Sequence, residues 1–369
     1  MRRWFHSDLS QIANAPPCIT LDAGPMGCVR PDRVNTVLFT GEDGHIHQLH
    51  LRGGTWIHTD LSLLANATDA AAQATTSPTG CVRPDGVFSI VYNGHAGHIH
   101  ALQIKEDTAS HVDLTDLAQA PRSLGSGHRI THFVRGDGVV VVIYISDPSH
   151  FHVNQLALSG NNWVHVDLTE LTHEQRDLVI FNAAGYVRSD RVTSVIFVDV
   201  ERGFQNNKGI RELALASNGN WTSTNLFNSP LTPHPISFRC PVGFVRGDGK
   251  ASVVYVGSDE GIHELAFVAG SWTATALSDA ANAPKFTTKF GSPAGYVRDD
   301  GVTAVVYLGN DDHIHELTLI DGHWLHSDLS VAASAAFGIP FAYVRSDGVS
   351  SIVYVASDKH IHELALLPA

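Results

Sequence analysis

The sequence has few of the features that mark several classes of protein. It contains only 4 Cys in 369 residues, too few for a scaffold built on disulfides. It has no apolar run of the roughly 18 residues that a membrane helix needs, and no hydrophobic signal region follows Met1. We therefore predict no membrane insertion and, by default, a cytoplasmic location, with non-classical export left open.

Positive charge is also scarce. The chain has 24 Lys and Arg against 37 Asp and Glu, a formal net charge of −13. Such a chain is repelled by a phosphate backbone, so we exclude nucleic acid as its main partner. The sequence also lacks a zinc-protease motif, a nucleophile-elbow serine and a phosphate-binding loop. We therefore expect a binding protein and leave catalysis open.

What the sequence does contain is a repeat. An arginine preceded by valine recurs at intervals of about 50 residues, and an aspartate follows each arginine two positions later. The seven arginines are Arg30, Arg83, Arg135, Arg188, Arg246, Arg298 and Arg345. Seven copies at this spacing indicate a single repeated architecture and not several unrelated domains.

The sixth unit gives the clearest strand pattern. We expect strands at residues 295–298, 303–308, 313–319 and 324–329, with a hairpin turn at Asp300-Gly301. Four antiparallel strands in a unit of this length are typical of a β-propeller blade. The fold class predicted is therefore all-β, a seven-bladed β-propeller that occupies residues 1–369 as one domain.

The two ends of the chain predict how the ring closes. The sequence finishes after a third strand at residues 360–366 and begins with a fourth strand at residues 4–9. Blade seven is then shared between residues 1–10 and 340–369, and its main-chain hydrogen bonds remove an exposed sheet edge.

The chain is rich in histidine, with 23 copies, and many recur in the third and fourth strands. Counting from the turns places His315 opposite Asp328, and the same count gives further pairs. These are His47 with Asp60, His100 with Asp113, and His362 with Asp8. One interpretation is a hydrogen-bonded staple in each blade. The alternative is a divalent metal held by His313, His315 and Asp328, since His-x-His places two imidazoles on one face. No other cofactor is expected.

Glutamate recurs in the third strand, at Glu212, Glu264, Glu316 and Glu363. It shares a face with the repeated arginine, and we expect the two side chains to meet between blades. The run Gly-Ile-x-Glu followed by a tryptophan strand, as at Gly261 to Glu264 with Trp272, resembles the repeat of fungal fucose-specific lectins and of related bacterial propeller lectins.

That resemblance implies carbohydrate sites between blades. By analogy, the four glutamates would accept sugar hydroxyls and nearby tryptophans would stack on a sugar face. The tryptophans are Trp4, Trp221, Trp272 and Trp324. This chain departs from the lectin pattern twelve residues before the glutamate, where Ser252, Ala304 and Ser351 replace the arginine of that family.

Blades three to five break the symmetry with irregular loops, which converge at one end of a propeller channel. The side chains that could form a single metal or acid–base pocket there are His128, His132, His150, His234 and Arg239. Two functions follow. The first is a lectin-like, multivalent module whose partners are glycans or glycoconjugates; the second is an enzyme with one pocket at the channel mouth. An oligomer is compatible with both.

Overall fold

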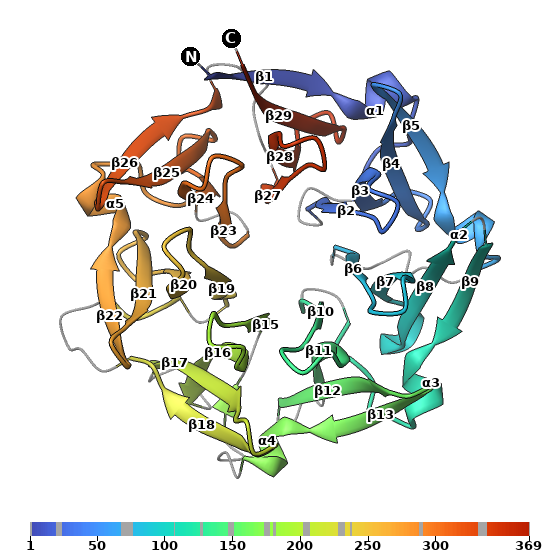
Figure 1. Ribbon diagram of the computed structural model, residues 1–369, viewed down its shortest axis with the longest axis horizontal. Helices are drawn as coiled ribbons and strands as arrows, with labels where there is room; N and C mark the ends of the chain where they lie inside the picture. Colours follow the sequence, from blue (N-terminus) through green and yellow to red (C-terminus); the bar gives the residue numbers. More distant parts are fainter. Residues whose placement is uncertain are drawn as a thin grey trace.

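Seven antiparallel sheets surround a central axis in the computed structural model of the chain (Figure 1). The structure describes residues 2–19, 24–67, 77–106, 108–125, 128–146, 151–172, 178–179, 182–201, 207–227, 233–236, 238–287, 291–330 and 338–368. The predicted all-β, seven-bladed propeller with four antiparallel strands per blade is confirmed. No described helix is long and apolar enough to cross a membrane.

Each blade runs from an inner strand at the axis to an outer strand at the rim (Figure 1). The strands of blades one to three are β2 (Met26–Val29), β3 (Asn35–Thr40), β4 (Ile46–Arg52), β5 (Thr55–Asp60), β6 (Thr79–Val82), β7 (Phe88–Asn93), β8 (Ile99–Lys105), β9 (Thr108–Asp113), β10 (Thr131–Val134), β11 (Val140–Ser146), β12 (His152–Ser159) and β13 (Asn162–Asp167).

Blade four differs from the others because its second strand pairs with an additional two-residue strand. The strands of blades four to six are β14 (Leu178–Val179), β15 (Ala183–Val187), β16 (Thr193–Glu201), β17 (Asn207–Leu215), β18 (Trp221–Asn225), β19 (Val242–Val245), β20 (Ala251–Val256), β21 (Ile262–Val268), β22 (Ser271–Ala276), β23 (Ala294–Val297), β24 (Thr303–Leu308), β25 (Ile314–Ile320) and β26 (His323–Asp328). In blade six the expected strands are therefore right to within one residue.

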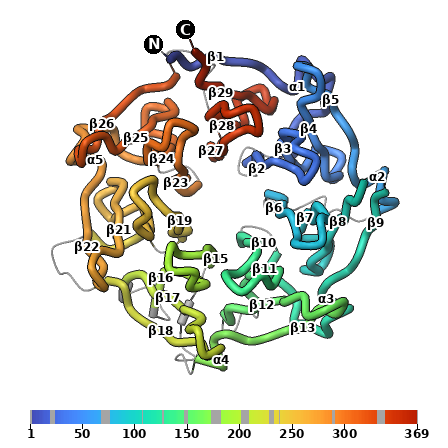
Figure 2. Tube along the Cα trace, viewed as in Figure 1, coloured from blue at the N-terminus to red at the C-terminus, as the bar shows by residue number. Residues whose placement is uncertain are grey.

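Blade seven closes the ring as predicted. It combines β1 (Arg2–Asp8) with β27 (Phe341–Val344), β28 (Ser350–Val355) and β29 (Ile361–Pro368). Strand β1 pairs antiparallel with β29 and sets Asp8 opposite His362. The two ends of the chain therefore lie side by side (Figure 2).

Among the described residues, short helices at the rim follow the outer strands of five blades. They are α1 (Leu9–Ala13), α2 (Leu61–Leu64), α3 (Leu114–Ala118), α4 (Leu168–Leu171) and α5 (Leu277–Ala280), with a 3-10 turn, η1 (His95–Gly97), in blade two. The last residue of the outer strand is an aspartate that caps the next helix; Asp60, for example, accepts a hydrogen bond from the Leu63 amide at 2.9 Å. Helix α5 follows Ala276 and has no side-chain cap.

The core lies between neighbouring blades. Leu38 of blade one packs with Phe88 and Leu102 of blade two, and equivalent clusters recur around the ring. Near the axis the blades approach so closely that an inner strand needs glycine. A Cβ on Gly243 would lie 2.2 Å from the ring of Tyr186 in the preceding blade. The residues that repeat in the sequence are thus the ones that make equivalent contacts between neighbouring blades.

Candidate functional site

The predicted histidine–aspartate register is confirmed, but the hydrogen bond is made by a different histidine. His47 lies opposite Asp60 in the backbone ladder, whereas Asp60 Oδ2 is bonded by His45 Nδ1 at 2.7 Å. Asp60 also caps α2, so its carboxylate points beyond the end of β5. In an antiparallel pair that direction leads back along β4 to His45. His313 with Asp328 and His360 with Asp8 repeat the arrangement, at 2.8 and 2.9 Å.

In blades one, six and seven, the second histidine of the His-x-His pair is buried and contacts an aspartate four residues earlier and a histidine of the outer strand. His47 Nε2 lies 2.9 Å from Asp43 Oδ1, and its Nδ1 lies 2.9 Å from His58 Nε2. His315 makes the same two contacts, with Asp311 and His326. These hydrogen bonds join the turn before the third strand to the outer strand. The side chains that link the strands are therefore an aspartate and two histidines in a row, and not the single His–Asp pair that was predicted.

This network moves the pKa values of its histidines in opposite directions. The hydrogen bond to Asp60 raises the pKa of His45, and the bond to Asp328 raises the pKa of His313. Burial, with the neighbouring His47, lowers the pKa of His58, and burial, with His315, lowers the pKa of His326. Protonation is therefore favoured on the histidine that precedes the third strand and disfavoured on the histidine of the outer strand.

Several of these clusters have the donor atoms of a metal site. Among the described residues, four groups of three or more His, Asp or Glu place their ligand atoms within 4.8 Å of one another. They are Asp8 with Asp358, His360 and His362; Asp43 with His45 and Asp60; His98 with Asp113 and Asp116; and His152 with Asp167 and Glu170. The predicted set His313, His315 and Asp328 is not one of these groups, because His315 is directed to Asp311 and His326.

The repeated arginine and glutamate meet within one blade, which corrects the expectation that they meet between blades. Arg246 Nη1 lies 3.4 Å from Glu264, and the Ser252 hydroxyl donates to Glu264 Oε1 at 2.6 Å. The reason is that the long arginine side chain, which follows the first strand, reaches across the second strand to the glutamate of the third strand in its own sheet. The equivalent pairs are Arg188 with Glu212, Arg298 with Glu316, and Arg345 with Glu363.

All four glutamates are buried, with exposed fractions of 1–3%. Burial raises the pKa of Glu264, Glu316 and Glu363. In blade six, where Ala304 replaces the serine, the Tyr296 hydroxyl donates to Glu316 Oε1 at 2.8 Å. The glutamates therefore hold arginines in place, and their carboxylates are covered by protein groups.

The arginines, by contrast, reach the clefts between blades. An inter-blade cavity of about 510 Å³ lies between blades three and four. Its blade-three wall contains Arg135, Asp137 and Gln155, and its blade-four wall contains Leu215 and Trp221. The sequence pattern pointed to Trp221 as a binding residue but not to Arg135, Asp137 and Gln155. The available signal was Gln155, which replaces the repeated glutamate.

The cleft between blades four and five has an arginine at the equivalent position, Arg188, but an aromatic side chain covers it. The Arg188 guanidinium carbon lies 4.3 Å from the centre of the Phe267 ring and 5.9 Å from that of Trp272. Phe267 faces Trp272 across the outer hairpin, as Leu215 faces Trp221 in blade four. A phenylalanine at this position covers the arginine, whereas Leu215 lines a cavity.

The other two predicted tryptophans pack against a neighbouring blade. Trp324 is buried with core residues of blade five, and Trp4 packs against the cluster between blades six and seven. A further inter-blade cavity of about 390 Å³ lies between blades one and two, lined by Arg30 and Asp32. Blade two has Ala109 at the tryptophan position, so this cavity lacks an indole wall.

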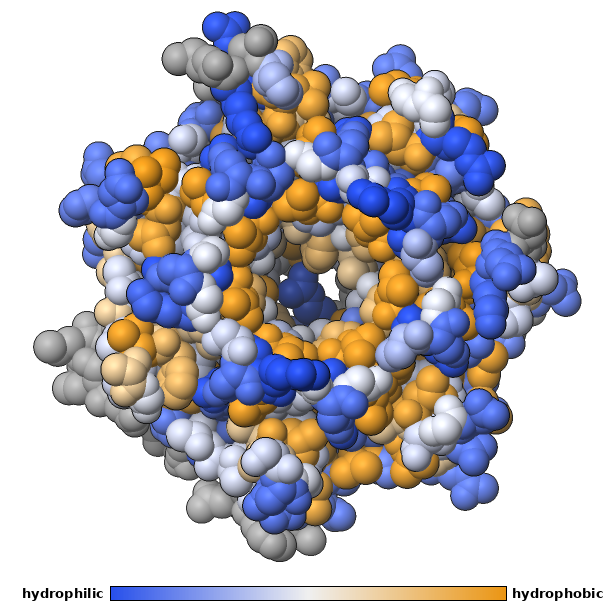
Figure 3. Space-filling model, viewed as in Figure 1, coloured by the Kyte–Doolittle hydropathy of each residue, from blue (hydrophilic) through white to orange (hydrophobic). Residues whose placement is uncertain are grey.

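The channel along the axis has a cavity of about 310 Å³ that is lined by inner strands of all seven blades. Figure 3 shows its opening, surrounded mainly by hydrophobic residues. His132 is part of this lining, and its Nε2 lies 3.2 Å from Cys81 Sγ. Burial lowers the pKa of His132 to about 4 and raises that of Cys81 to about 12. Both groups are therefore neutral at pH 7, and the thiol is not activated.

The alternative pocket predicted from the irregular loops is only partly assembled. His132 lines the channel cavity, whereas His128, His234 and Arg239 are not among its lining residues. His234 stacks on Phe227 with ring centres 4.9 Å apart, and Arg239 lies over Phe286. His150 lies outside the described residues.

Comparisons with known proteins find similarity in fold. No protein-family model and no curated protein matches the chain in sequence. A lectin from Burkholderia pseudomallei matches in structure at 11% identity and a TM-score of 0.65, covering 93% of this chain and 96% of that one. Aleuria aurantia lectin, in complex with a fucosylated disaccharide, matches at 14% identity and a TM-score of 0.51, covering 85% of this chain and 96% of that one.

An enzyme has the same architecture. A Penicillium chrysogenum α-L-arabinanase complexed with arabinobiose matches at 11% identity and a TM-score of 0.51, covering 79% of this chain and 92% of that one. Identities this low establish the fold alone. The chain therefore shares its propeller fold with these two lectins and with an α-L-arabinanase.

Proposed function

We propose that the chain is a carbohydrate-binding propeller whose principal site is the cleft between blades three and four. One observation carries this proposal: the cleft combines an open cavity of about 510 Å³, a half-buried indole and charged side chains from both blades. This is the composition expected of a site for a ligand with one apolar face and many hydroxyl groups.

The chemistry of each wall supports that assignment. Trp221 offers a ring on which the C–H face of a sugar stacks. Arg135 donates hydrogen bonds, Asp137 accepts them and Gln155 does both. The Arg135 guanidinium is bonded to Asp137, so its orientation is set before a ligand arrives. This bond also lowers the pKa of Asp137, which stays ionised at neutral pH.

The proposal changes the roles that the lectin resemblance implies. Glu212, Glu264, Glu316 and Glu363 become supports for the arginines, since their carboxylates are buried. The cavity between blades one and two becomes a second, weaker site without an indole wall. Two unequal sites per chain would still allow avidity towards a clustered glycan.

A glycan array on the purified protein tests this function. We expect binding to a related set of sugars, and we expect Leu215→Phe to abolish most of it because the new ring would cover Arg135 as Phe267 covers Arg188. Leu215→Met, which keeps an apolar side chain of similar volume at that position, is the matched control. Undiminished binding by the folded Leu215→Phe variant would exclude this cleft, and no binding by the wild type would contradict the function.

The second candidate, an enzyme with a pocket at the channel mouth, has less support. Glycoside hydrolysis usually needs two carboxyl groups on either side of the scissile bond. The described residues that line the channel cavity include no aspartate or glutamate. Incubating the protein with the glycans that it binds, followed by analysis of released sugars, separates the two functions, because turnover would favour the enzyme.

A further inference from the structure

We infer that the closure of the ring holds one divalent transition-metal ion, with Asp8, Asp358, His360 and His362 as its ligands. The ion would be Zn²⁺ or one with similar ligand preferences, such as Co²⁺ or Ni²⁺. This inference does not depend on the proposed carbohydrate site, which lies in a different part of the ring (Figure 1).

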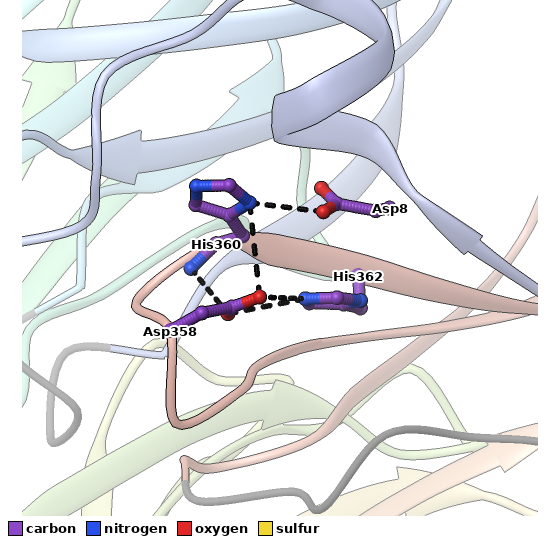
Figure 4. Close-up of side chains that lie close together, drawn as sticks. All are labelled: Asp8, Asp358, His360 and His362. Carbon is purple, nitrogen blue, oxygen red and sulfur yellow. Dashed lines mark hydrogen bonds and ion pairs between the residues drawn. The ribbon is translucent and has the colours of Figure 1, made fainter.

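The four side chains converge from two ends of the chain (Figure 4). Asp8 comes from the end of β1, and the other three come from the turn before β29 and from its first residues. His360 Nδ1 lies 2.9 Å from Asp8 Oδ2 and 3.8 Å from Asp358 Oδ2, and His362 Nε2 lies 3.2 Å from Asp358 Oδ1. In a tetrahedral zinc site with bonds of about 2.0–2.1 Å, neighbouring ligand atoms are about 3.3 Å apart. Small side-chain rotations therefore suffice to admit an ion.

The donor set fits a borderline metal and not a hard one. Two imidazole nitrogens and two carboxylate oxygens suit Zn²⁺, whereas Mg²⁺ and Ca²⁺ prefer oxygen alone. The two carboxylates supply the charge that balances a dication.

Groups outside the cluster orient each ligand. Asp8 Oδ1 accepts a hydrogen bond from the Gln11 amide at 2.8 Å, which leaves Oδ2 directed at His360. His6 Nε2 lies 2.8 Å from His362 Nδ1, so the opposite nitrogen, Nε2, faces Asp358. Partners of this kind fix the orientation of metal ligands and raise affinity.

The cluster is also accessible. The side chain of Asp358 is 47% exposed and that of His360 is 32% exposed, whereas that of His362 is 3% exposed. An ion can therefore enter from the solvent side and rest on a buried imidazole. Among the described groups, this is the one with four ligands; the other three have three each.

The consequence of metal binding would be a cross-link between the first and last strands, β1 and β29. The backbone already closes the ring through β1 and β29. A metal bound by Asp8 and by residues 358–362 would cross-link the two ends of the chain, and a ligand that binds only the folded ring stabilises it by mass action.

The experiment uses the full chain, treated with EDTA and dialysed, with ZnCl₂ as the probe. We expect isothermal titration to give one tight site per chain, and Zn²⁺ at a hundredfold excess over Kd to raise Tm by about 3–4 °C. Replacing Zn²⁺ by Co²⁺ would give the visible absorption of a four-coordinate ion. MgCl₂ at the same concentration would leave Tm unchanged.

Variants in two blades make the test specific. His360→Gln and Asp358→Asn would each weaken Zn²⁺ binding at least about tenfold. His313→Gln and Asp311→Asn, the equivalent changes in blade six, would leave binding intact and control for general loss of surface histidine or charge. Circular dichroism would establish that each variant is folded. Absence of stoichiometric binding, equal weakening by the blade-six variants, or about four equivalent ions per chain would each overturn the proposal.

Discussion

The cleft between blades three and four differs from the cleft between blades four and five by a few side chains. Both have an arginine from one blade and a tryptophan from the next, at equivalent positions. In the second cleft Phe267 lies over Arg188 at 4.3 Å, whereas in the first Leu215 lines a cavity of about 510 Å³. Repetition of the motif therefore preserves the fold, while the side chain that faces the tryptophan differs: Phe267 covers an arginine and Leu215 lines a cavity.

The support behind the arginine differs as well. Arg188 is backed by the carboxylate of Glu212, whereas Arg135 lies 3.5 Å from the neutral amide of Gln155. Arg135 therefore lacks the buried carboxylate that Arg188 has. Its positive charge is less neutralised by its own blade and is more available to a ligand in the cleft.

Both clefts exist only in the closed, folded ring. The largest effect that we expect is therefore a loss of the stability of the ring in acid. Burial, together with the nearby charge of Arg83, lowers the pKa of His132 to about 4, although a hydrogen bond with the Thr79 backbone acts in the opposite direction. Because the unfolded histidine takes up a proton near pH 6.5, its contribution to stability is complete above that pH and is lost as the pH falls towards 4. The loss is about 3 kcal/mol. In thermal melts, the Tm of the wild type should fall between pH 7 and pH 4, and the Tm of His132→Gln should fall less. The same dependence of Tm on pH in both proteins would contradict the role given to His132.

Removing the arginine of each cleft should separate ligand binding from stability. Arg135→Ala would reduce glycan affinity by about 30-fold or more, because it removes charged hydrogen bonds worth about 2–3 kcal/mol. Arg188→Ala would leave that affinity unchanged, since Arg188 is covered by Phe267, but would lower Tm because buried Glu212 loses its partner. Affinity measurements and thermal melts on both variants test this. A loss of glycan affinity in Arg188→Ala, with Arg135→Ala affecting only Tm, would contradict the difference between the two clefts.

The tryptophans provide a smaller contrast. Trp221→Ala would weaken glycan binding about tenfold, the effect of losing one stacked ring. Trp272→Ala is the matched control, because Trp272 lies at the same strand position in a filled cleft. Equal losses of affinity in the two variants would mean that the cleft between blades three and four is not the principal site.

The smallest effect is expected from opening the filled cleft. Phe267→Leu would expose Arg188 and add a weak second class of glycan sites, raising the number of sites measured at high ligand concentration without improving the affinity of the first class. Isothermal titration of Phe267→Leu beside the wild type gives both quantities. An unchanged site number in a folded variant would mean that the filled cleft is closed by more than this ring.

Much of the architecture could be predicted because each blade needs the same local features. The recurrent Val-Arg pair, the alternating strands and the tryptophan of the outer strand appear in every unit or nearly so. The ring closure between β1 and β29 followed from incomplete first and last units. Even the register of His315 opposite Asp328 was correct.

The hydrogen bonds were harder to predict because a register gives only the position of each Cα. Asp60 turns towards the helix that it caps and so bonds His45, although His47 is its backbone neighbour. The glutamates were correctly placed on the face of the arginines, yet the pairs form within a blade and are buried. Side-chain direction, which depends on packing, decided both outcomes.

The sequence by itself determined the number of blades, the strand order and the way in which the ends meet, because these depend on a pattern that recurs along the chain. Only the tertiary structure decided which cleft is open and which side chains converge at the ring closure. Those features depend on contacts between residues far apart in sequence, such as Arg188 with Phe267 and Asp8 with His360. No local pattern encodes such contacts, since each one exists only after neighbouring blades have packed.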